Sequence, residues 1–205
     1  MLNVACHCLH RPSQFPRGLH QKIVCLQATF LDPHTGQKAS DTEIKKRSFG
    51  RVSGNPAMIQ DAKQNEKSIS FIAEGVETAL SVKQIIGTTS KIFVTMGVSN
   101  LKNLPIDRLN KTVVIIADND GMNVNNLKSI DEFAKKLIDQ NKIVLIATPN
   151  KIPGLEKSDY NDVLIKQGVS AVKKSVADAV FYESENSLIN KTLAVKNSQA
   201  RDYVD

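Results

Sequence analysis

Four short runs of apolar residues recur through the middle of the chain and set its predicted architecture. Each run is five or six residues long, rich in Ile and Val, and apolar at nearly every consecutive position. Continuous apolar runs of this length are typical of strands that helices cover on both faces. The predicted strands are Ile69–Ala73, Ile92–Met96, Thr112–Ala117 and Ile143–Thr148.

Helical patterns occupy the segments between these strands. Glu77–Ile86 and Asn126–Gln140 place their apolar side chains on one face of a helix. The segment Ser99–Leu109 is short and contains Pro105, which predicts a broken or brief helix. Alternation of strands and helices at this spacing predicts an α/β domain, with a parallel four-stranded sheet joined by right-handed crossovers.

The two ends of the chain differ from this regular part. Residues 24–32 and 46–52 have the composition of two hairpin strands, separated by turn-forming residues at 32–36. An amphipathic helix is predicted after Gly168, and the residues from about 183 are polar and rich in Asn and Ser. The predicted organisation is a small β-rich segment over 1–66, the α/β domain over 67–168, and a helix with a loose polar tail over 169–205.

Composition excludes several classes of protein. The chain has 205 residues, 41% of them hydrophobic, and no apolar stretch approaches the ~18 residues that a membrane helix needs. The first residues lack an apolar segment of signal-peptide length, so we expect a cytoplasmic protein without membrane contact.

Cys6, Cys8 and Cys25 are odd in number and clustered, which suits a reducing compartment. Cys6, Cys8 and His10 are spaced too tightly for an ordinary zinc site, and their role stays open.

Positive charge is concentrated in the first part of the chain. The formal net charge is +6, and residues 1–66 hold nine Lys and Arg against five Asp and Glu. The densest basic run suits a polyanionic partner such as nucleic acid, although a solvated basic surface explains the charge alone equally well. The candidate nucleic-acid-binding residues are Lys45, Lys46, Arg47 and Arg51.

Acidic side chains follow two of the predicted strands. Glu74 comes directly after the first strand, and Asp118 and Asp120 come after the third. Ligands of open α/β sheets bind outside the carboxyl ends of the strands, and paired carboxylates there suit Mg²⁺. A third acidic cluster, with Asp159 and Asp162, precedes a predicted helix. Acids in such places also act as turn formers and helix caps, so each motif alone is weak.

Three blocks in this order resemble the TOPRIM domain of topoisomerases and primases. The blocks are Phe71–Leu80 around Glu74, Ile115–Gly121 around the Asp pair, and Lys157–Leu164. The residues of these blocks are similar to those of the TOPRIM proteins of phages, plasmids and conjugative elements, which are often of primase or primase-helicase type. The resemblance implies a Rossmann-like TOPRIM fold with a parallel four-stranded sheet flanked by helices.

The resemblance also implies an activity. A member of this branch would carry out Mg²⁺-dependent (or Mn²⁺-dependent) phosphodiester chemistry, most simply primase-type nucleotidyl transfer in replication or transfer of a mobile element. Single-stranded DNA and nucleotides would be its substrates, and a helicase or transfer protein its partner. Glu74, Asp118 and Asp120 would be the catalytic and metal-binding residues, with Asp159 and Asp162 as further candidate ligands.

Two departures from this branch leave other functions open. The chain has neither a CxxC pair for a zinc module nor a P-loop for a helicase, which predicts a short, truncated or split member. A non-catalytic DNA-binding module of a split primase or relaxase, and a TOPRIM nuclease, are therefore alternatives to a primase.

Overall fold

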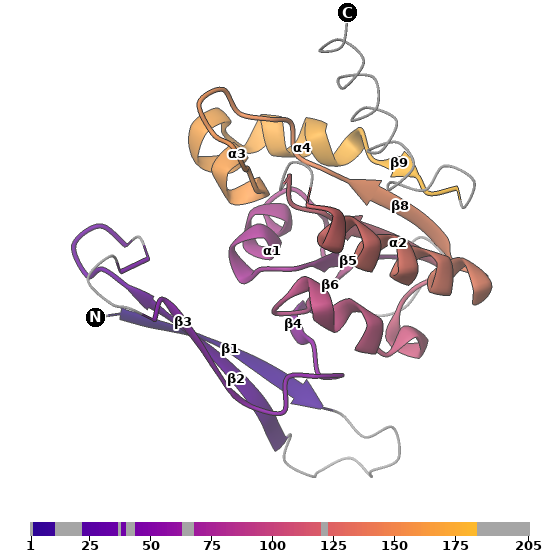
Figure 1. Cartoon of the computed structure of the whole chain (residues 1–205), viewed down its shortest axis with the longest axis horizontal. Helices are drawn as coiled ribbons and strands as arrows, with labels where there is room; N and C mark the ends of the chain where they lie inside the picture. The colour runs from indigo at the N-terminus through magenta and orange to yellow at the C-terminus, as the bar shows by residue number, and fades with distance from the viewer. Residues whose placement is uncertain are drawn as a thin grey trace, which may run out of the picture.

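The computed structural model describes residues 2–10, 22–36, 38–39, 44–62, 68–119 and 123–183, with main chain alone for 2–10, 22 and 23. Two sheets make up the described chain (Figure 1). A three-stranded antiparallel sheet comes from the first fifty residues, and a six-stranded mixed sheet with its helices follows.

The six-stranded sheet confirms the predicted α/β architecture. All four predicted strands form and pair in parallel, so that β5 lies between β6 and β7, and β7 pairs with β8. Two antiparallel edge strands, β4 and β9, extend the sheet beyond the four that the apolar runs predict. In spatial order the strands are β4 (Ala57–Gln60), β6 (Lys91–Val94), β5 (Ile69–Ala73), β7 (Thr112–Ile116), β8 (Ile143–Ala147) and β9 (Val180–Phe181).

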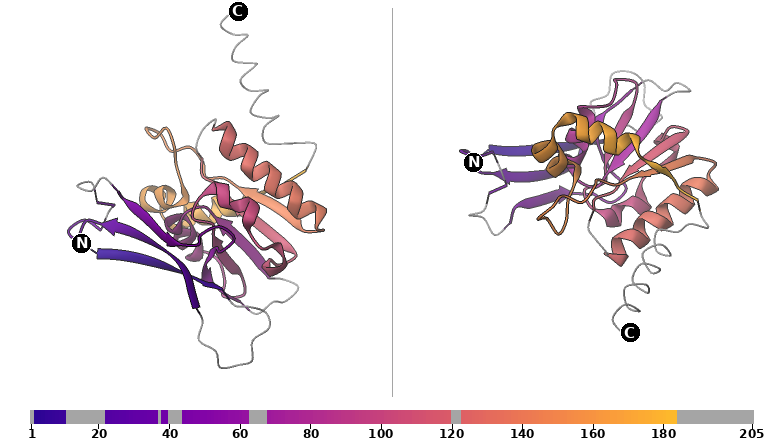
Figure 2. Two further views of the ribbon diagram at one scale, coloured as in Figure 1. Left: turned by 60° about the horizontal axis from the view of Figure 1, so that its bottom comes forward. Right: turned by 90° about the horizontal axis from the view of Figure 1, so that it is seen from above.

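Helices cover both faces of this sheet, which explains why its strands are apolar at consecutive positions (Figures 1 and 2). On β7, Val114 and Ile116 pack under α1, α3 and α4, while Val113 and Ile115 pack under α2 and the two short helices η1 and η2. The predicted brief helix before β7 is confirmed as η1 and η2. The helices are α1 (Val76–Lys83), η1 (Val98–Asn103), η2 (Ile106–Arg108), α2 (Val124–Asp139), α3 (Tyr160–Gln167) and α4 (Val169–Ala177).

The smaller sheet contains the predicted hairpin and one strand that the sequence pattern did not indicate. Strand β2 (Lys22–Leu31) pairs with β3 (Lys46–Gly50), and β1 (Leu2–His10) adds to the other side of β2. Cys6, Cys8 and His10 therefore lie on a strand, with side chains outside the described residues. The sulfur of Cys25 on β2 is a free thiol, buried against the Asn55 carbonyl oxygen at 3.5 Å.

The segment after α4 is held to the larger sheet by a buried polar group. Tyr182, which follows β9, donates its hydroxyl proton to Asp131 Oδ1 on α2 at 2.6 Å. Lys135 forms an ion pair with the other oxygen of Asp131 at 2.8 Å. A buried carboxylate with two such partners is compensated, so β9 is anchored on the face that α2 covers. Within the described ranges, every helix is too short or too polar to cross a bilayer.

Candidate active site

Glu74 and Asp118 lie side by side at the carboxyl edge of the larger sheet. Glu74 follows β5 and Asp118 comes two residues after β7, and these two strands are hydrogen-bonded neighbours in register, with Ala73 opposite Ile116. The sequence places these acids after two of the predicted strands, and in the structure those two strands are neighbours. Both residues line one small hollow that is open to solvent.

The remaining wall of this hollow comes from the loop after β6 and from α2. Thr95, which is buried, donates its main-chain N–H to the Ala73 carbonyl oxygen at 3.0 Å. Asn100 Nδ2 donates to the Thr95 carbonyl oxygen at 3.0 Å and holds the loop in a tight curve. The loop takes positive φ at Met96 (58°) and at Gly97 (139°), and the second value is one that an L side chain rarely adopts. The loop conformation thus brings Thr95 beside the two acids.

The third sequence block is joined to the second by main-chain hydrogen bonds. Asn119, the residue after Asp118, donates to the Ser158 carbonyl oxygen at 2.8 Å, and Ser158 donates back at 3.1 Å. Asn119 Nδ2 also donates to the Pro149 carbonyl oxygen at 3.0 Å. Blocks that lie about forty residues apart along the chain therefore meet, as expected if they contribute to one site.

Asp159 and Asp162 form the N-terminal cap of α3. Asp159 Oδ1 accepts the Asp162 N–H at 2.8 Å, and Asp162 Oδ2 accepts the Asp159 N–H at 3.1 Å, a reciprocal capping box. These hydrogen bonds use one oxygen of each carboxylate and account for both acids in the sequence. A metal-binding role for this pair stays a prediction.

The donor set at the sheet edge fits Mg²⁺, as far as it is described. Mg²⁺ binds through one or two carboxylates, and waters and substrate phosphates complete its coordination. Glu74 and Asp118 supply the two carboxylates at one hollow. Asp120 lies outside the described residues, and among the residues that are described no group of three His, Cys, Asp or Glu converges.

Glu77, the acidic residue of helix α1, joins the two sheets. Lys46 Nζ on β3 donates to Glu77 Oε2 at 3.0 Å, and Lys38 Nζ lies 3.1 Å from Oε1 as an ion pair without hydrogen-bond alignment. Burial opposes ionisation of Glu77, but a main-chain hydrogen bond and the two lysines outweigh burial and hold its pKa below the ordinary value. In the sequence, Glu77 stands only as the first residue of a predicted helical segment.

We expect Glu77→Gln to lower the free energy of unfolding by about 1–2 kcal/mol at pH 7, because two lysines lose a half-buried partner. A carboxyl with a lowered pKa in the folded state stabilises the protein above its unfolded-state pKa and loses that effect as pH falls through the folded-state value. The difference between the two proteins should therefore vanish in acid. Urea unfolding at pH 7 and near pH 3 measures it.

Glu132→Gln is the matched control for this measurement. Glu132 forms an exposed ion pair with Lys128 at 3.9 Å within one helix, so its replacement should cost about 0.5 kcal/mol or less. Equal losses for Glu77→Gln and Glu132→Gln, or a Glu77→Gln loss that persists in acid, would contradict the assigned role of Glu77.

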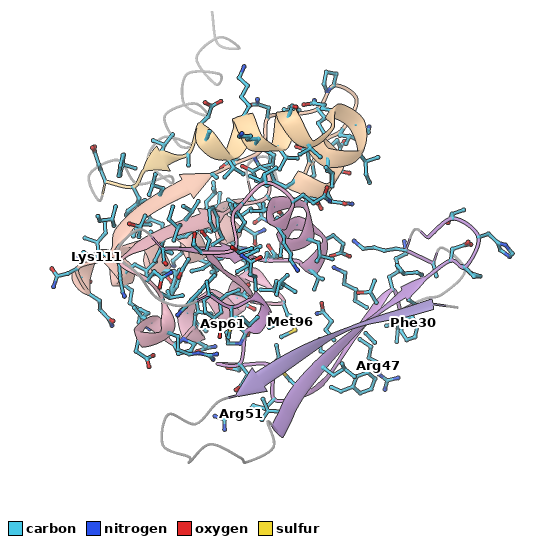
Figure 3. All side chains as sticks on the ribbon, turned by 180° about the vertical axis from the view of Figure 1, so that it is seen from behind. Phe30, Arg47, Arg51, Asp61, Met96 and Lys111 are labelled. Carbon is cyan, nitrogen blue, oxygen red and sulfur yellow. The ribbon has the colours of Figure 1, made fainter. Side chains whose placement is uncertain are left out.

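The four predicted basic residues differ in their surroundings. Lys46 faces α1 and is engaged by Glu77. Arg47 points to the opposite face of β3, where its guanidinium lies 5.3 Å from the centre of the exposed Phe49 ring. Lys45 and Arg51 flank the strand and are exposed. Figure 3 shows Arg47 and Arg51 on the smaller sheet.

Two residues of the site were missed by the sequence analysis. Thr95 follows β6, which neighbours β5, so the rule that ligands bind at the carboxyl ends of strands could have found it. Thr78 on α1 places its hydroxyl 3.4 Å from Asp118 Oδ1, a weak hydrogen bond to the acid. No sequence signal indicated Thr78, because its position depends on how α1 packs against β7.

Comparison with known proteins identifies the domain type. The family model described as Toprim domain matches residues 69–170. The comparison with curated proteins finds no match. Among solved structures, the chain is similar to a DNA primase domain from Pseudomonas aeruginosa (TM-score 0.54, 15% identity, 78% of this chain and 48% of that chain). It is also similar to the Escherichia coli primase catalytic core (0.54, 12%, 83% and 52%) and to a DnaG primase catalytic domain bound to single-stranded DNA (0.52, 12%, 78% and 48%).

These likenesses cover more than three quarters of the chain. At 12–15% identity they establish the fold alone. The chain spans about half the length of the primase chains that it matches.

Proposed function

Because residues 69–170 form a TOPRIM domain on a fold shared with primase catalytic cores, we propose that the chain carries out metal-dependent nucleotidyl transfer of primase type on single-stranded DNA. The observation that carries this proposal is the placement of Glu74 and Asp118 on paired strands at one hollow, joined by Thr95 and by the third sequence block.

Each residue has a separate role in this proposal. Asp118, with Asp120 two residues later, would hold a divalent cation, and Glu74 would hold the cation or accept the proton of the attacking hydroxyl group. The bound cation supplies charge neutralisation for the phosphoryl oxygens and the leaving group. Thr78 donates toward Asp118 Oδ1 and orients that carboxylate. The packed strands β5 and β7 hold these groups at a fixed spacing.

The direct test is a primer-synthesis assay with the chain, nucleotides, single-stranded DNA and Mg²⁺ or Mn²⁺. The proposal expects labelled oligonucleotides that form with metal and are lost with excess EDTA. Shortened or nicked DNA without new oligonucleotides would instead support a TOPRIM nuclease. Salt-sensitive DNA binding without either product would support a non-catalytic module. A helicase or transfer protein encoded by the same mobile element is the partner that we propose.

The exposed face of β3 is the surface that we propose for single-stranded DNA. Arg47 stacks on Phe49, and β2 places Leu26 and Ala28 opposite them on the same face. An arginine beside an exposed aromatic ring offers both a phosphate contact and a stacking platform for a base.

We expect Arg47→Ala and Phe49→Ala each to weaken binding of a short single-stranded oligonucleotide about tenfold. Fluorescence anisotropy at fixed salt measures the change. Lys46→Ala removes one positive charge from the neighbouring position of the same strand, but its side chain faces Glu77. A loss for Lys46→Ala as large as that for Arg47→Ala would show that net charge, rather than this face of β3, determines binding.

A further inference from the structure

Positive side chains gather at the amino edge of the larger sheet, the edge opposite to Glu74 and Asp118. Three of the four parallel strands begin at a lysine or directly after one: β6 at Lys91, β7 after Lys111 and β8 after Lys142. A five-residue strand is about 16 Å long, so this edge is separate from the acidic hollow. Figure 3 shows Lys111 far from Arg47 and Arg51 as well.

These lysines, which we call the amino-edge cluster together with Arg108, lie in or beside the loop between η2 and β7. Lys91 Nζ donates to the Arg108 carbonyl oxygen at 3.2 Å, and Lys142 Nζ donates to the next carbonyl oxygen, that of Leu109, at 2.8 Å. Lys111 Nζ donates to the carbonyl oxygen of Asn141. Two ammonium groups on adjacent carbonyl oxygens form a compact cationic site rather than a dispersed basic surface.

The charges of this cluster act on one another. Burial lowers the pKa of Lys142, and the charges of Lys111 and Lys91 lower it further, while Asp107 acts in the opposite direction. Positive groups held this close repel one another, and an anion placed among them removes the repulsion. The guanidinium of Arg108 is held in place by the Phe93 ring, 5.8 Å from the ring centre.

A buried amide lies within the same loop. Asn110 is 1% exposed, and its main-chain N–H donates to Ser70 Oγ at 2.9 Å. Neither its Nδ2 nor its Oδ1 has a hydrogen-bond partner in the part of the chain that the structure describes. Both side-chain atoms are buried from solvent, so a ligand bound at the surface does not contact them directly. Because Asn110 lies between Leu109, whose carbonyl oxygen accepts from Lys142, and Lys111, the signal of its side-chain amide reports on binding at this loop.

We propose that the amino edge of the sheet, formed by Lys91, Lys111 and Lys142, binds a phosphate group. Phosphate matches a compact set of ammonium donors, because its several oxygens can accept from more than one of them at once. The phosphate can belong to a nucleic-acid backbone or to a free nucleotide. The site lies outside the TOPRIM acidic hollow, so it supplies a second contact for a phosphate ligand that does not take part in the chemistry.

Titration of the full chain with inorganic phosphate tests this proposal by two-dimensional NMR of the side-chain amide of Asn110. Sodium chloride at equal ionic strength is the control for nonspecific screening. We expect a saturable shift with an affinity near or tighter than about 1 mM, and no saturable shift with chloride. Phosphate shifts that match those of chloride would overturn the proposal, whatever the result of the primer-synthesis assay.

Two double variants test whether phosphate binding depends on the amino-edge lysines or only on the net charge of the protein. Lys91→Gln with Lys142→Gln should weaken phosphate binding about tenfold or more, because two charged hydrogen-bond donors are lost. Lys173→Gln with Lys174→Gln removes the same charge from the exposed surface of α4 and should leave binding unchanged. Equal weakening of phosphate binding by both double variants would overturn the proposed site. If the first pair does not fold, the wild-type titration against chloride still decides.

Two competitors identify the source of the phosphate. A single-stranded oligonucleotide that displaces phosphate from the Asn110 signal identifies the nucleic-acid backbone as the ligand. Displacement by a nucleoside monophosphate, without displacement by the oligonucleotide, identifies a free nucleotide. Both results support a phosphate site at this edge.

Discussion

Asp118→Asn is expected to reduce metal-dependent nucleotide incorporation at least about a hundredfold, because it removes a negative ligand while keeping the size of the side chain. Asp118 lies two residues after β7 and beside Glu74, and it is within 3.4 Å of the Thr78 hydroxyl. An Asn at this position can still accept the Thr78 hydrogen bond. The fold should therefore survive, and the loss should appear in turnover and in metal dependence. The measurement is primer synthesis over a range of Mg²⁺ concentrations, with urea unfolding in parallel.

Asp139→Asn is the matched control for this substitution. Asp139 ends α2, is exposed, and carries the same charge, so its replacement should leave incorporation within about twofold of wild type, as surface changes generally do. If Asp118→Asn retains full activity, or if Asp139→Asn loses as much, the acidic hollow is not the catalytic centre. Loss of activity that higher Mg²⁺ restores would locate the defect in metal binding, as proposed.

The main strands and helices of the larger sheet could be predicted because their signal is local. Val113 to Ile116 are all apolar, and the structure explains this pattern by two separate cores that receive alternate side chains of the same strand. Glu74 and Asp118 could be predicted for a related reason. The carboxyl ends of neighbouring parallel strands lie at one edge of the sheet. Residues that directly follow two such strands in the sequence are therefore expected to lie close together.

The parts that the sequence did not predict depend on packing between distant segments. Strand β1 has no apolar run of its own, and its pairing with β2 joins residues about twenty positions apart. Glu77 resembles an ordinary first-turn acid of a helix, and only the approach of β3 makes it the partner of Lys46. Asp159 and Asp162 show the reverse case, because one local motif is compatible with a helix cap and with a ligand set. The structure shows the cap, and the ligand role stays a prediction.

Tyr160 is expected to make the stability of the domain fall in alkali. Its side chain is fully buried in the core between α1, α3 and α4, within 3.3 Å of Ser175 Oγ. Burial, with a smaller contribution from the charges of Asp118 and Asp178, raises its pKa to about 12, although a hydrogen bond from Ser175 opposes this shift. A raised pKa in the folded state means that the stabilisation is complete below pH 10 and is lost as pH rises toward 12.

This loss should amount to roughly 2–3 kcal/mol for Tyr160, because each pKa unit corresponds to about 1.4 kcal/mol. Tyr160→Phe removes the titrating group and keeps the ring. It should cost about 1 kcal/mol at pH 8 and should flatten the decline between pH 10 and pH 12. Tyr182 also has a raised pKa, through burial and its hydrogen bond to Asp131, so some decline should remain in this variant. Urea unfolding at closely spaced pH values measures both effects.

Tyr160→Ala separates the packing of the ring from its ionisation. Removal of a fully buried aromatic ring should cost about 3–5 kcal/mol at pH 8, where the hydroxyl is neutral in both the folded and unfolded states. Because Asp118 raises the pKa of Tyr160, Asp118→Asn should lower that pKa toward its unfolded-state value and so reduce the alkaline loss of stability. If Tyr160→Phe declines as steeply as wild type, another group causes the alkaline loss. If Asp118→Asn leaves the size of the alkaline loss unchanged, the acidic hollow and this buried hydroxyl are not electrostatically coupled.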